Sequence, residues 1–390
     1  MNKKLKSIVY INFRPYENAG KILDYLLENF ENVFLFSFNF HKLGKNQEPS
    51  KLKIFKKGHF IKEKELYQIN LPSPLTLTFL LLPVRSLMIM IQIIWYSIIL
   101  KKKYKKLDIY FTVNAFTAWI GNILRSLKIV KKTIFWVWDY YPPINTNKIV
   151  TLFRWIYWQF DKIGASSNSL IFLNRRLENL RKDIGILSKR AKYPIVEIGT
   201  NPISKVESKE NLNRPILFGF IGVVKKSQGL DIFFDTAREL KSLLPNSMLE
   251  IIGSGPDELY FKRRAKKCPI KTKFYGFLPS ENEISRIVSK WDIGIATYIP
   301  EESNVSYYGD PSKIKVYLSF GIPVVTTDVY VFSKEVAKSK AGVIIDYYKK
   351  SEFISAISII LSAHKQFRER ALLLAQKYHY KKIYPKIFNI

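Results

Sequence analysis

The sequence predicts an α/β protein made of two Rossmann-like domains. Its 390 residues exceed what a single hydrophobic core usually holds, so the length favours two domains. In two regions, short apolar runs alternate with segments of helical periodicity, which is the pattern of parallel βαβ units. Between them, residues 199–215 are polar, lack periodicity and are bounded by prolines, as expected of a linker. We therefore expect domains at 1–204 and 205–375, and a C-terminal helix at 376–390 that returns to the first domain.

The apolar runs predict the individual elements. In the first region strands are expected at 7–13, 33–40, 108–113 and 133–141, with a helix at 19–30. In the second region strands are expected at 216–224, 248–255, 273–278, 292–298, 323–327 and 341–346, with a helix at 230–244. Because open parallel sheets bind ligands at the carboxyl ends of their strands, we expect the two domains to face each other across a cleft lined by these loops.

The formal net charge of +31 limits the classes of partner. Nucleic acid, an anionic membrane and phosphorylated substrates are the ordinary partners of so basic a surface. The lysines are scattered in pairs and short runs, without zinc-finger, RNP-type or helix-turn-helix spacing, so we expect no nucleic acid. A single cysteine, Cys268, excludes an internal disulfide and fits a reducing compartment. No signal peptide is evident at the start, and we expect a cytoplasmic location.

Residues 76–100 form the most apolar stretch and have three interpretations. The uninterrupted part, 86–100, is shorter than the roughly 20 residues that a spanning helix needs, so a transmembrane helix is one alternative and a buried helix another. Trp95 and Tyr96, followed by KKKYKK at 101–106, fit a third interpretation. One helix face would pack on the sheet and the other would enter an anionic membrane surface. We favour this peripheral attachment to the inner face of the cell membrane.

The turn after the first strand of the second region, 222-GVVKKSQGLD-231, is a candidate diphosphate site. Gly222 permits a tight turn, Lys225 and Lys226 supply cations, and Gly229 opens a helix whose amides attract anions. An ordinary strand-to-helix turn with solvated lysines is equally consistent with this pattern.

Two later strand ends extend the candidate site. Gly253 and Gly255 in GSGP would allow either a close approach of ligand to backbone or a plain tight turn. Tyr275 in FYGFLP could stack on a nucleobase, although the core is the commoner place for such a ring.

The segment 307-YYGDPSKIKVYLSFGIPVV-325 gives the strongest signal. Asp310 and Pro311 predict a helix start, with the aspartate as N-cap. Lys313 and Lys315 then lie in the first turns, where the helix dipole disfavours cations, so a bound anion is expected to compensate. Gly321 is expected to end the helix.

Together these segments resemble the GT-B glycosyltransferases, especially glycosyltransferase family 4 (group 1). DPSKIKVYLSFGIPVVTT is similar to the DPxKIxEYLAxGxPVV helix of that family, GVVKKSQGLD to its Gxxxxx(K/Q)GLD loop, and EIIGSGP to its xIxGxGP strand end. In the first region, IFWVWDYYPP at 134–143 and the segment 155–176 resemble the stretch that precedes the linker. The resemblance spans most of 105–345.

The resemblance implies a retaining, hexosyltransferase-like glycosyltransferase that moves a sugar from a UDP- or GDP-linked donor to a lipid-linked or polysaccharide acceptor in cell-surface glycan synthesis. The first domain would hold the acceptor and the second the donor. Basic side chains would stabilise the leaving diphosphate, so no metal cofactor is expected, and no Asp-x-Asp pair occurs. The catalytic candidates are Asp139, Lys225 and Lys313. The donor-binding candidates are Gly222, Lys226, Gly253, Gly255, Tyr275, Glu302, Tyr308, Asp310 and Lys315.

Two departures concern the paired glutamates of the family, which would fall at Tyr308 and Val316. In the family the second glutamate accepts hydrogen bonds from the nucleotide ribose, which a valine cannot do. Glu301, Glu302 or Asp310 could substitute from the preceding loop.

Other departures concern the phosphate pair and the acceptor side. Val223 stands in place of the arginine of the usual phosphate pair, so Lys225 or Lys226 would have to replace it. The cleft histidine of the family is not evident, since His41 and His59 lie in no recognisable motif. Asp139, at a predicted strand end, is the better candidate for the acceptor or sugar side, although it could simply cap a turn.

These departures keep two other functions open. The first is a GT-B-fold protein that has lost catalysis and binds a glycan or a partner. The second is a GT-B sugar-nucleotide epimerase.

Overall fold

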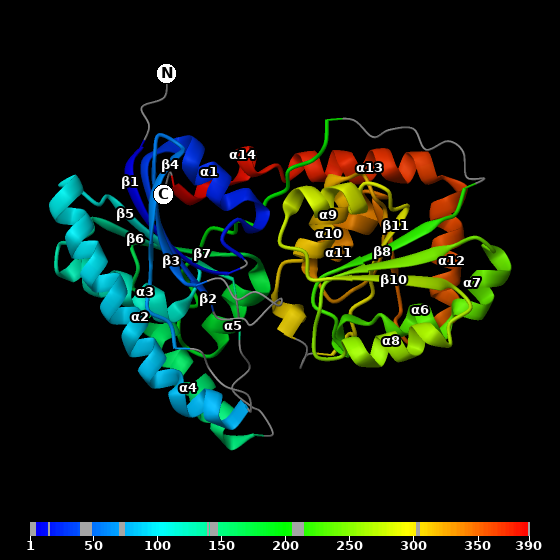
Figure 1. Ribbon diagram of the computed structural model, residues 1–390, viewed down its shortest axis with the longest axis horizontal. Helices are drawn as coiled ribbons and strands as arrows, with labels where there is room; N and C mark the ends of the chain where they lie inside the picture. Colours follow the sequence, from blue (N-terminus) through cyan, green and yellow to red (C-terminus); the bar gives the residue numbers. More distant parts are fainter. Residues whose placement is uncertain are drawn as a thin grey trace. The chain divides into compact units, whose positions relative to one another are not determined.

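The computed structural model describes residues 5–14, 16–39, 49–69, 75–138, 140, 147–204, 214–301 and 305–388 (Figure 1). The chain divides into two compact units. Of the described residues, the first comprises those up to Glu197 together with 383–388, and the second comprises those within Ile198–Lys382. Each unit contains helices and one mainly parallel sheet, which confirms the predicted α/β class.

The first unit contains a seven-stranded sheet in the order β4-β3-β2-β1-β5-β6-β7. Its five mutually parallel strands are β1 (Leu5–Arg14), β2 (Phe30–Asn39), β5 (Ile109–Thr112), β6 (Lys132–Val137) and β7 (Ser169–Phe172). Most of their described side chains are buried. Parallel strands covered on both faces need continuous apolar runs, which is why four of them could be predicted.

An antiparallel hairpin at the edge of this sheet was not predicted. β3 (Lys51–Lys56) pairs with β2, and β4 (His59–Glu65) pairs with β3. The backbone angle φ is 51° at Lys57 and 85° at Gly58, as a type I′ turn requires. Because β4 is exposed throughout and alternates lysine with glutamate, hydrophobic patterning gave no sign of it.

The helices of the first unit are η1 (Ala19–Lys21), α1 (Ile22–Asn29), α2 (Leu75–Tyr104), α3 (Ala115–Ser126), α4 (Lys148–Gly164) and α5 (Arg175–Asp183). Asparagine side chains cap three of these helices by accepting hydrogen bonds from first-turn amides: Asn114 on α3, Asn147 on α4 and Asn174 on α5. Helices α2, α3 and α4 contact one another.

The C-terminal residues form two short helices, α14 (Tyr380–Ile383) and α15 (Pro385–Phe388), not the single helix expected over 376–390. Residues from Ile383 through α15 belong to the first unit, whereas Tyr380–Lys382 belong to the second. The hydroxyl of Tyr384 donates to the carbonyl oxygen of Gly20 at 2.7 Å. The ring of Phe388 stacks on Tyr25, with centroids 5.6 Å apart.

The second unit contains a six-stranded, wholly parallel sheet in the order β10-β9-β8-β11-β12-β13. Its strands are β8 (Leu217–Ile221), β9 (Met248–Ile252), β10 (Lys271–Gly276), β11 (Ile293–Ala296), β12 (Val324–Thr327) and β13 (Gly342–Ile345). This is the Rossmann strand order, and its topological switch point lies between β8 and β11.

The helices of the second unit are η2 (Lys226–Gln228), α6 (Asp231–Asp235), α7 (Ala237–Leu243), α8 (Glu258–Lys266), α9 (Glu281–Val288), η3 (Val305–Tyr308), α10 (Ser312–Ser319), α11 (Val331–Lys338), α12 (Lys350–Ser362) and α13 (His364–Lys377). The helix predicted over 230–244 is broken at Thr236, which separates α6 from α7. The hydroxyl of Thr236 donates to the carbonyl oxygen of Ile232 at 2.8 Å, a local bond that competes with helix continuation.

Candidate functional site

The switch point of the second sheet brings together two loops that carry several of the predicted site residues. β8 leads into residues 222–230, and the described residues 297–301 and 305–311 lie between β11 and α10. Open α/β sheets bind ligands at this place, outside the carboxyl ends of the strands that flank the switch point.

The glycines of this region let two loops pack closely. A Cβ at Gly253 would lie 1.9 Å from the carbonyl oxygen of Gly222, and one at Gly255 would lie 2.4 Å from that of Val224. The amide of Val224 also donates to the carbonyl oxygen of Ser254 at 3.0 Å. Contact between the loops therefore accounts for Gly253 and Gly255, a reason that the sequence could not reveal.

Lys313 has a buried side-chain nitrogen with few polar partners. Its side chain is only 6% exposed, and its Nζ lies 3.1 Å from Oε1 of Gln228 and 3.7 Å from the ring centroid of Phe220. A Cβ at Gly222 would lie 3.2 Å from Lys313 Cε, so the glycine leaves room for the lysine stem. Within the described residues, Lys313 forms an ion pair with no carboxylate. Burial lowers the pKa of its ammonium group well below the usual lysine value.

A desolvated ammonium group with an amide oxygen as its polar partner is unstable in the absence of a counter-charge. Aromatic rings at 3.7 Å and 4.8 Å, those of Phe220 and Tyr298, offset part of this penalty. An anion bound beside Lys313 would offset more of it. The site can therefore bind a negatively charged group such as a phosphate.

Lys315 and Asp310 occupy a different position from the one predicted. Their side chains are 2% and 3% exposed, and they form an ion pair with Nζ and Oδ2 2.6 Å apart. Asp310 accepts a hydrogen bond from the amide of Ile198, and Lys315 donates to the carbonyl oxygen of Ile198 at 2.8 Å. The pair thus binds both backbone groups of Ile198, the residue at which the main segment of the second unit begins.

This geometry corrects the prediction that Asp310 is the N-cap of the helix. α10 begins at Ser312 with Pro311 as its N-cap, so Asp310 does not cap it. The ammonium of Lys315 is committed to Asp310 and Ile198, which argues against a role in binding phosphate. The predicted helix end is confirmed: Gly321 has φ 62° and its amide donates to the carbonyl oxygen of Leu318.

Three other candidates differ in their surroundings. Lys225 is exposed. Lys226 lies over the ring of Tyr260, with Nζ 4.1 Å from the centroid. The hydroxyl of Tyr275 donates to Glu250, which also accepts from the indole of Trp291 at 2.7 Å. A stacking role for Tyr275 stays a prediction.

The positions of the missing glutamates are both described. Tyr308 is partly buried, and its ring lies edge-on to Tyr307 with centroids 5.1 Å apart. Val316 is partly buried and packs against an apolar cluster that contains Ile314 and Tyr317. The valine is thus accounted for by packing.

Several candidates could not be placed. Asp139, Glu302 and His41 lie outside the residues that the structure describes. Of the other residues considered, Glu301 is exposed and His59 lies on the exposed strand β4.

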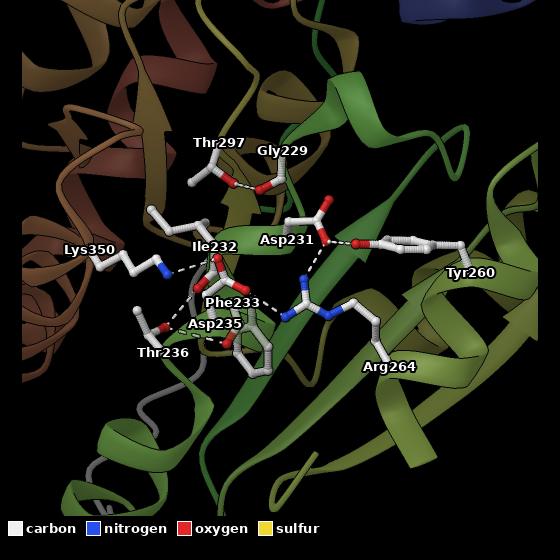
Figure 2. A network of polar contacts seen from close by, with 10 residues as sticks. All are labelled: Gly229, Asp231, Ile232, Phe233, Asp235, Thr236, Tyr260, Arg264, Thr297 and Lys350. Atoms are coloured by element: carbon white, nitrogen blue, oxygen red, sulfur yellow. Dashed lines mark hydrogen bonds and ion pairs between the residues drawn. The ribbon is translucent and has the colours of Figure 1, made fainter. Parts of the chain in front are cut away.

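A polar network that the sequence did not predict fixes the start of α6 (Figure 2). Arg264 of α8 forms ion pairs with Asp231 and Asp235 of α6, and Asp231 also accepts from the hydroxyl of Tyr260. Burial raises the pKa of Asp235, but hydrogen bonds from Arg264 and Lys350 outweigh it and lower the pKa below its usual value.

The same figure shows how the preceding loop is tied to β11. The hydroxyl of Thr297 donates to the carbonyl oxygen of Gly229 at 2.9 Å. Gly229 has φ 72°, and a Cβ there would lie 1.7 Å from the carbonyl oxygen of Thr297. The network therefore positions the loop that carries Gln228, a residue that sequence reasoning did not single out.

Comparison with known proteins agrees with this architecture. Residues 203–372 match the family described as glycosyl transferases group 1. An "uncharacterized glycosyltransferase" of Haemophilus influenzae is 22% identical over 187 residues, which are 47% of this chain and 49% of the relative. The chain thus matches about half the length of that curated relative.

Solved structures extend the likeness in fold. The pneumococcal O-GlcNAc transferase GtfA, in complex with UDP and GlcNAc, is 14% identical with a TM-score of 0.53, covering 72% of this chain and 55% of its own. WaaG, a glycosyltransferase involved in lipopolysaccharide biosynthesis, is 14% identical with a TM-score of 0.60, covering 95% of each chain.

The fold is therefore GT-B, built from two Rossmann-like units, as predicted. The family match identifies residues 203–372 as a glycosyl transferases group 1 segment.

Proposed function

We propose that the protein is a retaining glycosyltransferase that transfers a sugar from a UDP- or GDP-linked donor to a lipid-linked or polysaccharide acceptor. The observation that carries this proposal is Lys313, whose buried side-chain nitrogen lies at the switch point and has no described carboxylate partner. The group 1 match over 203–372 and the UDP bound to the structural relative GtfA support a nucleotide as the ligand.

Lys313 would act on the leaving group. When the bond between the anomeric carbon and the diphosphate breaks, negative charge grows on the phosphate oxygens. An ammonium already fixed in a dry site stabilises that charge without further reorganisation. Gln228 orients the ammonium, and Gly222 leaves space beside it. We propose that this arrangement operates without a metal ion.

Calorimetric titration with UDP and GDP tests the binding step. Wild-type protein should bind at least one of them, and Lys313→Met should weaken that binding roughly 10- to 100-fold, the value of a charge-assisted contact. Lys290→Met is the matched control, because Lys290 is an exposed lysine of the same unit. Unchanged affinity in Lys313→Met would refute the role of the ammonium.

Product analysis tests the reaction. The anomeric proton of the product, observed by NMR, should show the configuration of the donor, and inversion would contradict the retaining mechanism. The residues at Tyr308 and Val316, where the family has glutamates, favour a binding protein without catalysis as the second candidate. A protein that binds nucleotide but releases none from any sugar donor would support it, and a new sugar-nucleotide formed without acceptor would indicate an epimerase.

A further inference from the structure

Helix α2 of the first unit has one wholly apolar exposed face. Every exposed position between residues 83 and 99 carries an apolar side chain. After Pro83 these positions recur every three or four residues, so they form one stripe along the helix. The stripe consists of Val84, Leu87, Ile91, Trp95 and Ile99, which are 41–61% exposed.

Helix α4, which contacts α2, has a second apolar stripe. It consists of Ile149, Leu152, Trp155 and Ile163, which are 40–56% exposed. The other exposed positions of α4 are lysines, Lys148 and Lys162. Two neighbouring helices thus each expose a tryptophan within an apolar stripe.

The opposite side of α2 is fixed to the sheet. Ile89, Ile93 and Leu100 belong to the core of the first unit. Gln92 is 8% exposed and binds the backbone of Tyr67 twice, accepting from its amide at 2.7 Å and donating to its carbonyl oxygen at 3.0 Å. Leu81–Tyr104 is long and apolar enough to cross a membrane by length and composition. Crossing would remove these side chains from the core and break both bonds to Tyr67, so the contacts favour a helix lying on a surface.

The charged residues of α2 and of the two positions that follow it are all cationic. Residues 75–106 contain no aspartate or glutamate, and α2 is followed by the exposed lysines Lys105 and Lys106, after Lys102 and Lys103 within its last turn. The acidic residue of α4, Asp161, is buried and paired with Arg181 at 2.7 Å. A second copy of the chain would present the same cations and therefore no charge complement. An anionic lipid surface supplies both an apolar phase and negative charge.

We propose that the apolar stripes of α2 and α4 insert into the interfacial layer of an anionic bilayer, with Trp95 and Trp155 at headgroup depth and the lysines on the headgroups. Attachment is peripheral, and α2 remains packed on its sheet. If the proposed function also holds, and only then, the acceptor is a lipid-linked glycan taken from the same bilayer. The docking itself does not depend on transferase activity.

Flotation of the full-length protein with vesicles tests the apolar contact. Vesicles in which about three lipids in ten are phosphatidylglycerol present an anionic surface and should bind the wild-type protein. Vesicles of pure phosphatidylcholine should bind it weakly. Ile91→Ser with Trp95→Ser should reduce partitioning roughly tenfold or more, because exposed apolar area is lost from the lipid contact. Leu259→Ser with Leu373→Ser is the matched control, since both leucines are exposed in the second unit. Equal loss in both variants would overturn the proposal.

Charge reversal tests the electrostatic contact. Lys102→Glu with Lys103→Glu should weaken binding by about 25-fold or more, roughly fivefold for each lysine removed. Lys266→Glu with Lys267→Glu changes the net charge equally at exposed positions of α8 and its C-cap, and should have a much smaller effect.

Three other outcomes would each reject peripheral lipid docking. The first is that the protein does not float with vesicles at low salt. The second is that it stays on the vesicles both in 1 M salt, where the Debye length is about 3 Å, and in alkaline carbonate, as a spanning helix would. The third is that it self-associates through the stripes in the absence of lipid. Circular dichroism of each variant confirms folding, and the flotation readout is independent of nucleotide binding.

Discussion

Two lysines two residues apart on α10 should respond in opposite ways to the same substitution. Lys313 and Lys315 are 6% and 2% exposed, yet Lys315 pairs with Asp310 whereas Lys313 has an amide partner. Lys315→Met leaves the Asp310 carboxylate buried without its cation, which costs about 3–5 kcal/mol of unfolding free energy. For a unit of this size that corresponds to a fall in Tm of roughly 6–20 °C.

Lys313→Met removes a desolvated ammonium and keeps an unbranched side chain of similar length. We expect its unfolding free energy to equal or exceed that of the wild type, because the burial penalty of the charge disappears. The thermal stabilisation by UDP or GDP should also decrease, because nucleotide that binds roughly 10- to 100-fold more weakly stabilises the folded protein less at the same concentration.

Differential scanning calorimetry of both variants, with and without each nucleotide, is the assay. Adding Asp310→Asn to Lys315→Met removes both charges of the pair and should recover part of the lost stability. The reasoning is refuted if Lys313→Met lowers Tm as much as Lys315→Met does, or if Lys313→Met retains the full stabilisation by nucleotide.

Three further predictions follow from the second unit. The folded-state pKa of Lys313 lies below the unfolded value of roughly 10.4, so the unfolded chain binds more protons at pH values between the two. The free energy of unfolding should therefore rise with pH across that window. Urea denaturation should find this rise in the wild type and not in Lys313→Met. Gly253→Ala should lower the free energy of unfolding by at least about 2 kcal/mol, because the new methyl group meets a carbonyl oxygen and φ is 127°. Gly185→Ala, at a position with open space and φ 74°, should lower it by about 1 kcal/mol. Similar losses for both variants in urea denaturation would contradict the clash at Gly253. Arg264→Met should lower the free energy of unfolding by about 1–2 kcal/mol, a value discounted because the Arg264 side chain is 26% exposed. The neighbouring substitution Arg263→Met should change it little. Equal changes in Tm for the two variants would show that the network adds no stability.

The sequence predicted the buried parallel strands because those runs are apolar on both faces. It missed β4, whose side chains are exposed throughout, and with it the neighbouring strand β3. It also missed β7, although strands of the same length, such as β5, were predicted. It also predicted one helix where Thr236 separates α6 from α7, since a threonine bond to the preceding turn is invisible to hydrophobic periodicity.

The candidate site was predictable by position and less so by role. Lys313 and Lys315 looked equivalent because spacing carries no information about burial partners. Each has a partner that lies far away in the chain: Gln228 is 85 residues from Lys313, and Ile198 is 117 residues from Lys315. A sequence motif shows that a lysine is present. Only the tertiary structure shows whether its side chain lies at a candidate ligand site or binds a backbone segment.

Release of nucleoside diphosphate from a sugar donor tests the central claim most directly. ³¹P NMR would follow a panel of UDP- and GDP-sugars incubated with the full chain and a membrane lipid extract as acceptor source. We predict release from at least one donor, reduced roughly 10²- to 10³-fold in Lys313→Met and unchanged in Lys290→Met. Folded wild-type protein that releases no diphosphate from any donor, or Lys313→Met that turns over at the wild-type rate, would contradict the proposed function.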